Sequence, residues 1–225
     1  MGYLIVDLET QRDRSLPERS SEDFPPPTYH QIVCVGVGYV SIERPVVKLS
    51  AFVGDERCIL GRFVSGSAFD EPERSHQRQA PGHTLVTFNG RRFDVPVLVA
   101  RCMRQGLAWP WYWRERAARI RYSSDAHLDL SDELTDFGAA QPCGLDAWSR
   151  CIGQVGKNGD GASVEGLAAA KEWDRIGRYC VQDVRLTAAL LLRWLLVRGR
   201  VSGAQEAELL AMLRDAEPEI AVLGG

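Results

Sequence analysis

Five side chains that could bind a metal ion or position a water molecule occur in three separate segments of this 225-residue chain. They are four carboxylates and one phenol: Asp7, Glu9, Asp94, Tyr179 and Asp183. Carboxylate oxygens are the ligands that hard divalent cations such as Mg²⁺ and Mn²⁺ prefer. Each segment also has an ordinary structural explanation, so the elements that carry these residues decide whether they form one site.

Asp7 and Glu9 lie at the end of a short apolar run, Tyr3–Leu8, that predicts a buried central strand. Because side chains alternate along a strand, the two carboxylates face the same side and Leu8 faces the other. Burying unpaired carboxylates is costly, so a neutralising cation is favoured if the strand is central. The alternative is a strand that simply ends in a polar loop.

Asp94 ends the segment Asn89–Asp94, which follows another apolar run, Thr84–Phe88. This run predicts a second central strand, and the Asn-Gly turn after it leads into a helix predicted over Asp94–Gln105. Such a turn brings the residues near Asp94 back over the strand ends, where ligands bind in open α/β sheets. Taken alone, Asp94 is better explained as a helix N-cap.

Tyr179 and Asp183 are four positions apart in a long predicted helix, Asp174–Arg198, so they share one helix face. Leu186 and Leu190 continue the same stripe, which predicts that Asp183 points towards the core side. A boundary residue on a solvated edge is the alternative explanation for Asp183.

The whole pattern predicts one α/β domain over residues 1–225, with a core at 3–198 and a helical tail at 203–215. A mixed five-stranded sheet flanked by helices is expected, and its first three strands form an antiparallel meander. The other expected strands are 31–40, 46–52 and the short 128–130. Further helices are expected at 55–69 and within 145–172, with loops at 11–30 and 70–83 and a Gly-rich break at 156–161.

Composition and charge describe an ordinary soluble globular protein, with 45% hydrophobic and 25% charged residues. A net charge of −3 argues against a protein that coats nucleic acid by bulk charge, but it allows a local basic track. The six cysteines show neither a C-x-x-C pair nor zinc-site spacing, so reduced thiols in a cytoplasmic protein are expected. No apolar run predicts a signal peptide or a membrane span.

Aromatic and basic residues crowd one stretch in the middle of the chain. Trp109, Trp111 and Trp113 are followed by arginines at positions 114, 116, 119 and 121. Indole rings can stack on unpaired bases. Packing is the more frequent role of tryptophan, and it is expected for at least two of the three.

The three acidic segments together resemble the Exo I, Exo II and Exo III motifs of the DEDD 3′→5′ exonucleases. The tyrosine in the third motif indicates the DEDDy subclass. DLET (7–10), FNGRRFDVPVL (88–98) and YCVQDVRLT (179–187) are especially similar to the proofreading domains of family B DNA polymerases and to stand-alone exonucleases that resemble them. HQIVCVGVGY (30–39) and HLDLSDEL (127–134) also fit the stand-alone group, so the resemblance covers about residues 3–190.

This resemblance implies a ribonuclease-H-like fold and two divalent cations, Mg²⁺ or Mn²⁺. It implies that Asp7 bridges both cations. Glu9 and Asp183 would hold the cation that binds the attacking water, and Asp94 would support the second cation directly or through water. Tyr179 would orient the water, because a phenol is a poor base at neutral pH.

The implied activity is hydrolysis of phosphodiester bonds from the 3′ end of single-stranded DNA, with release of nucleoside 5′-monophosphates. The implied partner is therefore nucleic acid, and proofreading or DNA repair is the expected setting. Substrate contacts are expected, by resemblance or by position, from Thr10, Phe88, Asn89, Arg91, Arg92, Phe93 and Asp129.

Three other functions compete with this one. Phosphatases of the haloacid dehalogenase type need D-x-D-x-T, whereas this chain has Glu9 at the second acidic position and a Tyr179–Asp183 pair with no role there. A silent nucleic-acid-binding module on the same fold is disfavoured because all five positions are filled. An exoribonuclease stays open, although oligoribonucleases usually carry His at the position of Tyr179, which favours DNA.

Overall fold

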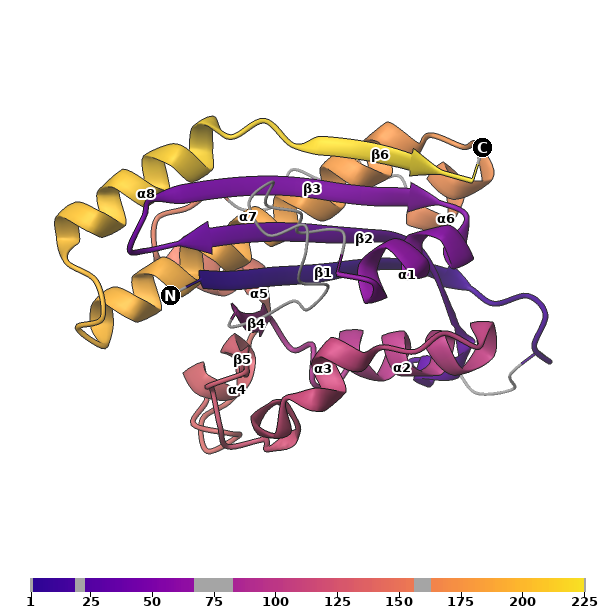
Figure 1. The fold of residues 1–225 in the computed structure, drawn as a ribbon, viewed down its shortest axis with the longest axis horizontal. Coiled ribbons are helices and arrows are strands. Elements are labelled where there is room, and N and C mark those ends of the chain that lie inside the picture. The colour runs from indigo at the N-terminus through magenta and orange to yellow at the C-terminus, as the bar shows by residue number, and fades with distance from the viewer. Residues whose placement is uncertain (1, 19–22, 67–82, 156–162, 225) are drawn as a thin grey trace.

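A computed structural model describes residues 2–18, 23–66, 83–155 and 163–224, which form one mixed sheet with helices on both faces (Figure 1). The sheet has six strands in the order β5-β4-β1-β2-β3-β6. The strands are β1 (Gly2–Arg12), β2 (His30–Ser41), β3 (Val46–Gly54), β4 (His83–Thr87), β5 (His127–Asp129) and β6 (Glu219–Leu223). The predicted α/β class is confirmed, and the predicted count of five strands is wrong.

The strand directions explain why β1 is a suitable place for carboxylates. β1, β2 and β3 form the expected antiparallel meander, whereas β4 runs parallel to β1 and β5 runs parallel to β4. β1 is therefore an interior strand with a neighbour on each side. Because β1 and β4 point the same way, their carboxyl ends meet at one edge of the sheet, where ligands tend to bind.

The strand that the sequence does not predict is β6, which follows the expected C-terminal helix and pairs in parallel with β3. Gly54 shows how closely the two strands meet. Its φ is +114°, and a Cβ atom on it would lie 2.4 Å from the carbonyl oxygen of Leu223. A five-residue strand of this kind depends on pairing with a segment far away in the sequence, so its local pattern is weak.

Helices cover both faces of the sheet. They are α1 (Glu56–Val64), α2 (Asp94–Gln105), α3 (Pro110–Arg114), α4 (Leu130–Leu134), α5 (Leu145–Cys151), α6 (Val164–Ala169), α7 (Trp173–Val197) and α8 (Gly203–Asp215), with 3₁₀ turns at Pro27–Tyr29 and Arg116–Arg119. Residues 67–82 and 156–162, which include the end of the predicted helix 55–69, most of the loop 70–83 and the Gly-rich break, lie outside the described residues. None of the helices in the described ranges could span a membrane.

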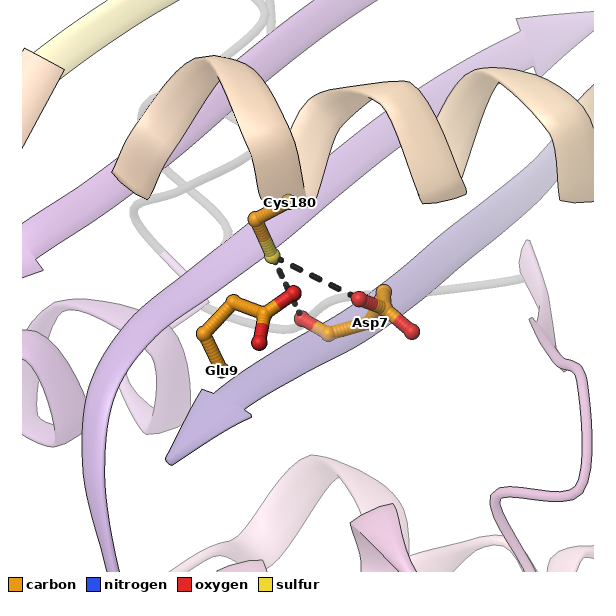
Figure 2. Close-up of side chains that lie close together, drawn as sticks. All are labelled: Asp7, Glu9 and Cys180. Carbon is orange, nitrogen blue, oxygen red and sulfur yellow. Dashed lines mark hydrogen bonds between the residues drawn. The ribbon is translucent and has the colours of Figure 1, made fainter. Parts of the chain in front are cut away.

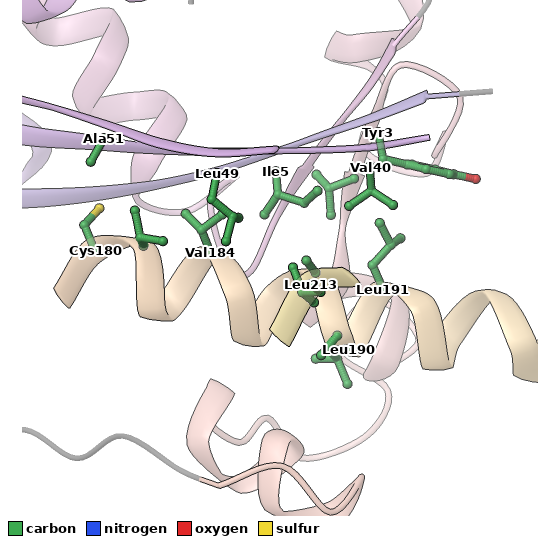
Figure 3. Packing of buried hydrophobic residues seen from close by; sticks show 14 of the residues in the cluster. Tyr3, Ile5, Val40, Leu49, Ala51, Cys180, Val184, Leu190, Leu191 and Leu213 are labelled. Carbon is green, nitrogen blue, oxygen red and sulfur yellow. The ribbon is translucent and has the colours of Figure 1, made fainter. Parts of the chain in front are cut away.

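Two hydrophobic cores lie on opposite faces of β1. Tyr3 and Ile5 pack towards α7, with Val184 and Leu191 of that helix between α7 and the sheet (Figure 3). Leu4, Val6 and Leu8 belong to the other core, which contains the apolar residues of α1 and α2. Because side chains alternate along β1, its odd-numbered residues, including Asp7 and Glu9, belong to the α7 face.

Two glycines in β2 allow α7 to approach the sheet. Gly36 pairs with Asp7, and a Cβ atom on Gly36 would lie 2.7 Å from the sulfur of Cys180 in α7. A Cβ atom on Gly38 would lie 2.7 Å from a methyl group of Val184. Larger residues at these two positions of β2 would push α7 away from the sheet. The two glycines therefore allow the middle of α7 to lie close to the carboxylates of β1.

Candidate active site

A cleft of about 560 Å³ lies where β1 and β4 end beside α2 and α7. Its lining includes all five residues of the three predicted segments: Asp7, Glu9, Asp94, Tyr179 and Asp183. The other lining residues are Leu8, Phe24, Phe88, Asn89, Arg92 and Phe93. The structure thus brings the predicted carboxylates and the tyrosine together from a strand, the start of one helix and the middle of another.

Asp7 and Glu9 project from β1 towards α7, where Cys180 joins them (Figure 2). Their carboxylate oxygens and the Cys180 sulfur all lie within 4.8 Å of one another. The thiol lies 3.5 Å from the backbone oxygen of Asp7 and 3.6 Å from its Oδ2 atom. Burial, the neighbouring Cys34 thiol and the two carboxylates raise the pKa of Cys180 well above its ordinary value. Cys180 is therefore a protonated hydrogen-bond donor to Asp7.

The sequence pattern did not assign Cys180 to the site, although a signal for it exists. Cys180 directly follows Tyr179 and falls on the buried stripe of α7. All six cysteines are free thiols in the structure.

Asp94 is the first residue of α2, and Phe93 occupies the N-cap position. The explanation of Asp94 as an N-cap is therefore wrong. Burial raises the pKa of Asp94 to about 7, and the carboxylates of Asp129 and Asp183 add to the shift. Hydrogen bonds from the backbone N–H groups of Asp94 itself and Leu8 act in the opposite direction. Burial and the neighbouring acids therefore disfavour the charged form of Asp94.

This donor set fits a hard divalent cation. The four carboxylates of the cleft supply oxygen atoms, which Mg²⁺ and Mn²⁺ prefer. Asp94 and Asp183 are buried, whereas Asp7 and Glu9 are half-buried. A cation among these groups would offset the repulsion from Asp129 and Asp183, which adds to the effect of burial on the pKa of Asp94.

Tyr179 lines the same cleft one helical turn before Asp183. Its side chain is half-buried, whereas that of Asp183 is buried. The phenol therefore lies nearer to the solvent side of the cleft than the carboxylate does, on the shared face of α7.

The predicted substrate contacts divide into two groups. Phe88, Asn89, Arg92 and Phe93 line the cleft, whereas Thr10, Arg91 and Asp129 do not. The Thr10 hydroxyl lies 3.0 Å from Nδ1 of His30, and both residues line a neighbouring pocket of about 290 Å³.

Arg91 and Asp129 shape the turn between β4 and α2. The Arg91 guanidinium donates to the backbone oxygens of Ala118 at 2.9 Å and His127 at 2.8 Å. The Asp129 carboxylate accepts the backbone N–H groups of Asn89 and Arg91, each at 2.8 Å. These bonds hold Asn89 in the left-handed region, with a φ of +63°. Both side chains therefore fix the turn that presents Asn89 and Arg92, and neither reaches the cleft itself.

Phe24 is a lining residue that the sequence pattern did not single out. Its ring is 74% exposed, and its centroid lies 5.2 Å from that of His30 and 5.7 Å from that of Phe93. It belongs to the Pro-rich loop after β1, where no periodic pattern marks a side chain as buried or exposed. Only its position at the cleft reveals it.

The chain is similar to known exonucleases in sequence and in fold. Residues 22–220 match a family model described as "Predicted 3'-5' exonuclease related to the exonuclease domain of PolB". Among curated proteins, no sequence matches the chain. A product-bound structure of exonuclease I has a TM-score of 0.50 at 12% identity, over 93% of this chain and 46% of that one.

Two further structures of exonuclease I show the same degree of similarity. One is a complex with the inhibitor BCBP, and the other is the structure that suggested how processivity is achieved. Each has a TM-score of 0.50 at 12% identity, over 93% of this chain and 43% of that one. The chain therefore spans less than half the length of these exonuclease I chains, and the likeness lies in the fold.

The mixed six-stranded sheet with flanking helices is thus similar in fold to exonuclease I. The match to the family model extends over most of the chain and includes Asp94, Tyr179 and Asp183. The resemblance to the DEDD exonucleases is confirmed: the chain belongs to the family of 3′–5′ exonucleases related to the exonuclease domain of PolB.

Proposed function

We propose that this protein is a metal-dependent 3′→5′ exonuclease that removes nucleoside 5′-monophosphates from the 3′ end of single-stranded DNA. The observation that carries the proposal is the meeting of Asp7, Glu9, Asp94, Tyr179 and Asp183 in one cleft. Membership of an exonuclease family supports the direction of hydrolysis.

The carboxylates of Asp7, Glu9, Asp94 and Asp183 would hold two Mg²⁺ or Mn²⁺ ions. When bound, such ions stabilise charge on the scissile phosphate and lower the pKa of an attacking water. Cys180 donates to Asp7 and so helps to orient its carboxylate. Tyr179 positions the attacking water by hydrogen bonding, since phenols are poor bases at neutral pH.

The remainder of the cleft suits the last nucleotide of an unpaired strand. Phe24, Phe88 and Phe93 supply aromatic surface on which a base can stack. Arg92 is exposed at the same cleft and can pair with a phosphate in bidentate geometry. Asn89 adds an amide that is able to contact the sugar or the backbone.

The experiment is a time course with 5′-labelled single-stranded DNA in Mg²⁺ or Mn²⁺. A ladder that shortens from the 3′ end is expected, together with release of mononucleotides. EDTA and the Asp7→Ala variant should both abolish it, whereas Asp215→Ala, which removes an exposed carboxylate of α8, should not. Shortening that persists in EDTA or in Asp7→Ala would overturn the proposal.

A matched RNA oligomer tests the substrate. Faster turnover of DNA than of RNA is expected under identical conditions. Faster turnover of RNA would support the proposed reaction but would identify RNA as the preferred substrate. Binding of either oligomer without hydrolysis would identify a silent nucleic-acid-binding module.

A further inference from the structure

A concentration of positive charge lies on the surface between α3 and β5. Residues 114–121 contain four arginines and one glutamate, in a chain whose net charge is −3. All four arginines are exposed. Arg121 pairs with Asp132 at 2.8 Å, and within the described ranges no ion pair involves Arg114, Arg116 or Arg119. These three guanidinium groups are therefore available to an external anion.

Aromatic side chains are interleaved with these arginines. Trp113 is 45% exposed and Tyr122 is 74% exposed, so each presents a ring to solvent. The other two tryptophans of this stretch behave as expected for packing: Trp109 is buried, and Trp111 packs against the core beneath α2. The exposed set is named the Arg-aromatic surface: Trp113, Arg114, Arg116, Arg119, Arg121 and Tyr122.

Hydrogen bonds connect the segment that carries the Arg-aromatic surface to a turn that borders the candidate active site. Figure 1 shows α3 beside α2, at the edge of the sheet formed by β4 and β5. The guanidinium of Arg91 donates to the backbone oxygens of Ala118, Ile120 and Ser123, at 2.9, 3.4 and 3.5 Å. Its chain neighbour Arg92 lines the cleft. The turn that contains Arg91 and Arg92 therefore connects the cleft with this surface.

We propose that the Arg-aromatic surface binds single-stranded nucleic acid upstream of the 3′ end held in the cleft. Guanidinium groups track the phosphates, and Trp113 and Tyr122 stack on unpaired bases, a combination typical of single-strand binding. A duplex offers phosphates but no free base faces, so the aromatic rings favour a single strand. The inference rests on the proposed function, because it assigns the upstream part of the same substrate.

The test measures binding separately from hydrolysis. In EDTA, with the Asp7→Asn variant as background, affinity is measured by fluorescence anisotropy for single-stranded oligomers of about 4 and about 16 nucleotides. The variants are Arg116→Ala with Arg119→Ala, and separately Tyr122→Ala. The control pair is Arg44→Ala with Arg200→Ala, which removes two exposed arginines elsewhere. Thermal melting verifies that each variant is folded.

The arginine pair should weaken binding of the longer oligomer about tenfold or more and lower the salt slope by about 1.4, at roughly 0.7 per phosphate contact. Tyr122→Ala should weaken it roughly tenfold. The shorter oligomer and the control pair should show little change. Equal loss in the control pair, equal loss with the short oligomer, or unchanged affinity for the long one would overturn the proposal.

Two further outcomes separate the inference from the proposed function. If the native protein hydrolyses no nucleic acid but the two arginine substitutions still weaken binding, the exonuclease proposal fails and the proposed binding surface stands. If hydrolysis occurs but the variants bind long oligomers normally, the exonuclease stands and this surface has another partner, such as an acidic protein.

Discussion

Buried carboxylates lie at two places along α2. The pKa is lowered for an acid at one place and raised for an acid at the other. Near its C-terminal end, Arg101 binds Asp13 and Glu56, and the pKa of Asp13 is lowered to about 2. At its N-terminal end, the pKa of Asp94 is raised to about 7. Both places are buried, so burial alone cannot explain the difference.

The Arg101 cluster carries its own countercharge. The guanidinium donates to Glu56 through Nε and Nη2, both at 2.6 Å, and to Asp13 through Nη1 at 2.5 Å. Burial acts to raise the pKa of Asp13, but hydrogen bonds from Ser15 and Arg101 outweigh it. Glu56 also accepts the backbone N–H of Ile32, so the cluster joins α1, α2, β2 and the end of β1.

Around Asp94, the charges that shift its pKa are those of Asp129 and Asp183, which are acids as well. The Arg101 cluster thus has its countercharge within the folded chain, whereas the acids around Asp94 would gain one only from a cation in solution. A buried group of acids beside a cleft therefore points to function more strongly than burial of charge does by itself.

The largest effect is expected at the site. Asp7→Asn should lower single-turnover hydrolysis of DNA by about 10⁴-fold, ~5 kcal/mol of activation free energy, because one of the carboxylates proposed to hold the ions is lost. The melting temperature in EDTA should not fall, because a negative charge leaves an acidic cluster. Asp215→Asn is the matched control. Activity within tenfold of the native protein would break the assignment.

The next effect is expected at the Arg101 cluster. Arg101→Met leaves Asp13 and Glu56 buried without their cation, which should cost about 3–5 kcal/mol of unfolding free energy. Urea denaturation measures this cost. Arg104→Met, whose side chain is 44% exposed and 3.7 Å from Asp13, should cost less than about 1 kcal/mol. Equal costs would show that the buried cluster is no more important than a surface pair.

The pH dependence of stability should have opposite slopes for the two places. In metal-free protein, the folded state holds the Asp94 proton up to a pKa of about 7, against an ordinary value of 3.8, so stability falls as pH rises across this window. Asp13, with a pKa of about 2, stabilises the fold above pH 3.8, and this contribution is lost as pH falls towards 2.

Urea denaturation in EDTA between pH 2 and 8 resolves both slopes. Asp94→Asn should remove the loss of stability between about pH 4 and 7, and Asp13→Asn should flatten the acid limb. If Asp94→Asn leaves the slope unchanged, that acid is not the group that titrates there.

The smallest effect is expected from Asp129→Asn, which removes one of the two acids whose charges add to the raised pKa of Asp94. An amide cannot accept both backbone N–H groups of the turn, so a cost of about 1–3 kcal/mol in stability is expected. The pKa of Asp94 should also fall, so the acid limb of the activity profile should move to lower pH. Asp125→Asn, an exposed acid nearby, should leave that limb in place.

Elements with a long local pattern were predictable from the sequence. The helices Asp94–Gln105 and Gly203–Asp215 have the expected bounds, and 46–52 lies within β3. β6 was missed because its five residues gain their order from β3, which lies far away in the chain. A pattern read along the chain contains propensity and periodicity but not the identity of a distant partner strand.

The same limit applies to the site. Residue types and spacing were enough to select Asp7, Glu9, Asp94, Tyr179 and Asp183 for one cleft, because each lies on an element with a clear pattern. The expected substrate roles of Arg91 and Asp129 depended on sequence neighbourhood alone. Arg91 contacts Ala118, which is 27 positions away, and Asp129 contacts Asn89, which is 40 positions away. No local sequence pattern encodes contacts at such separations.

The pairing of β6 with β3 has a consequence for the state of the chain in solution. An uncovered edge strand presents a row of unpaired N–H and C=O groups, which is a template for pairing with another molecule. Along Ser50–Gly54 those groups face β6 instead. A variant truncated before Glu219 would expose that edge, so self-association through β3 should increase even if the cleft stays intact. β6 takes the edge position of the sheet in place of β3, and its five residues present a shorter edge than the nine residues of β3 would.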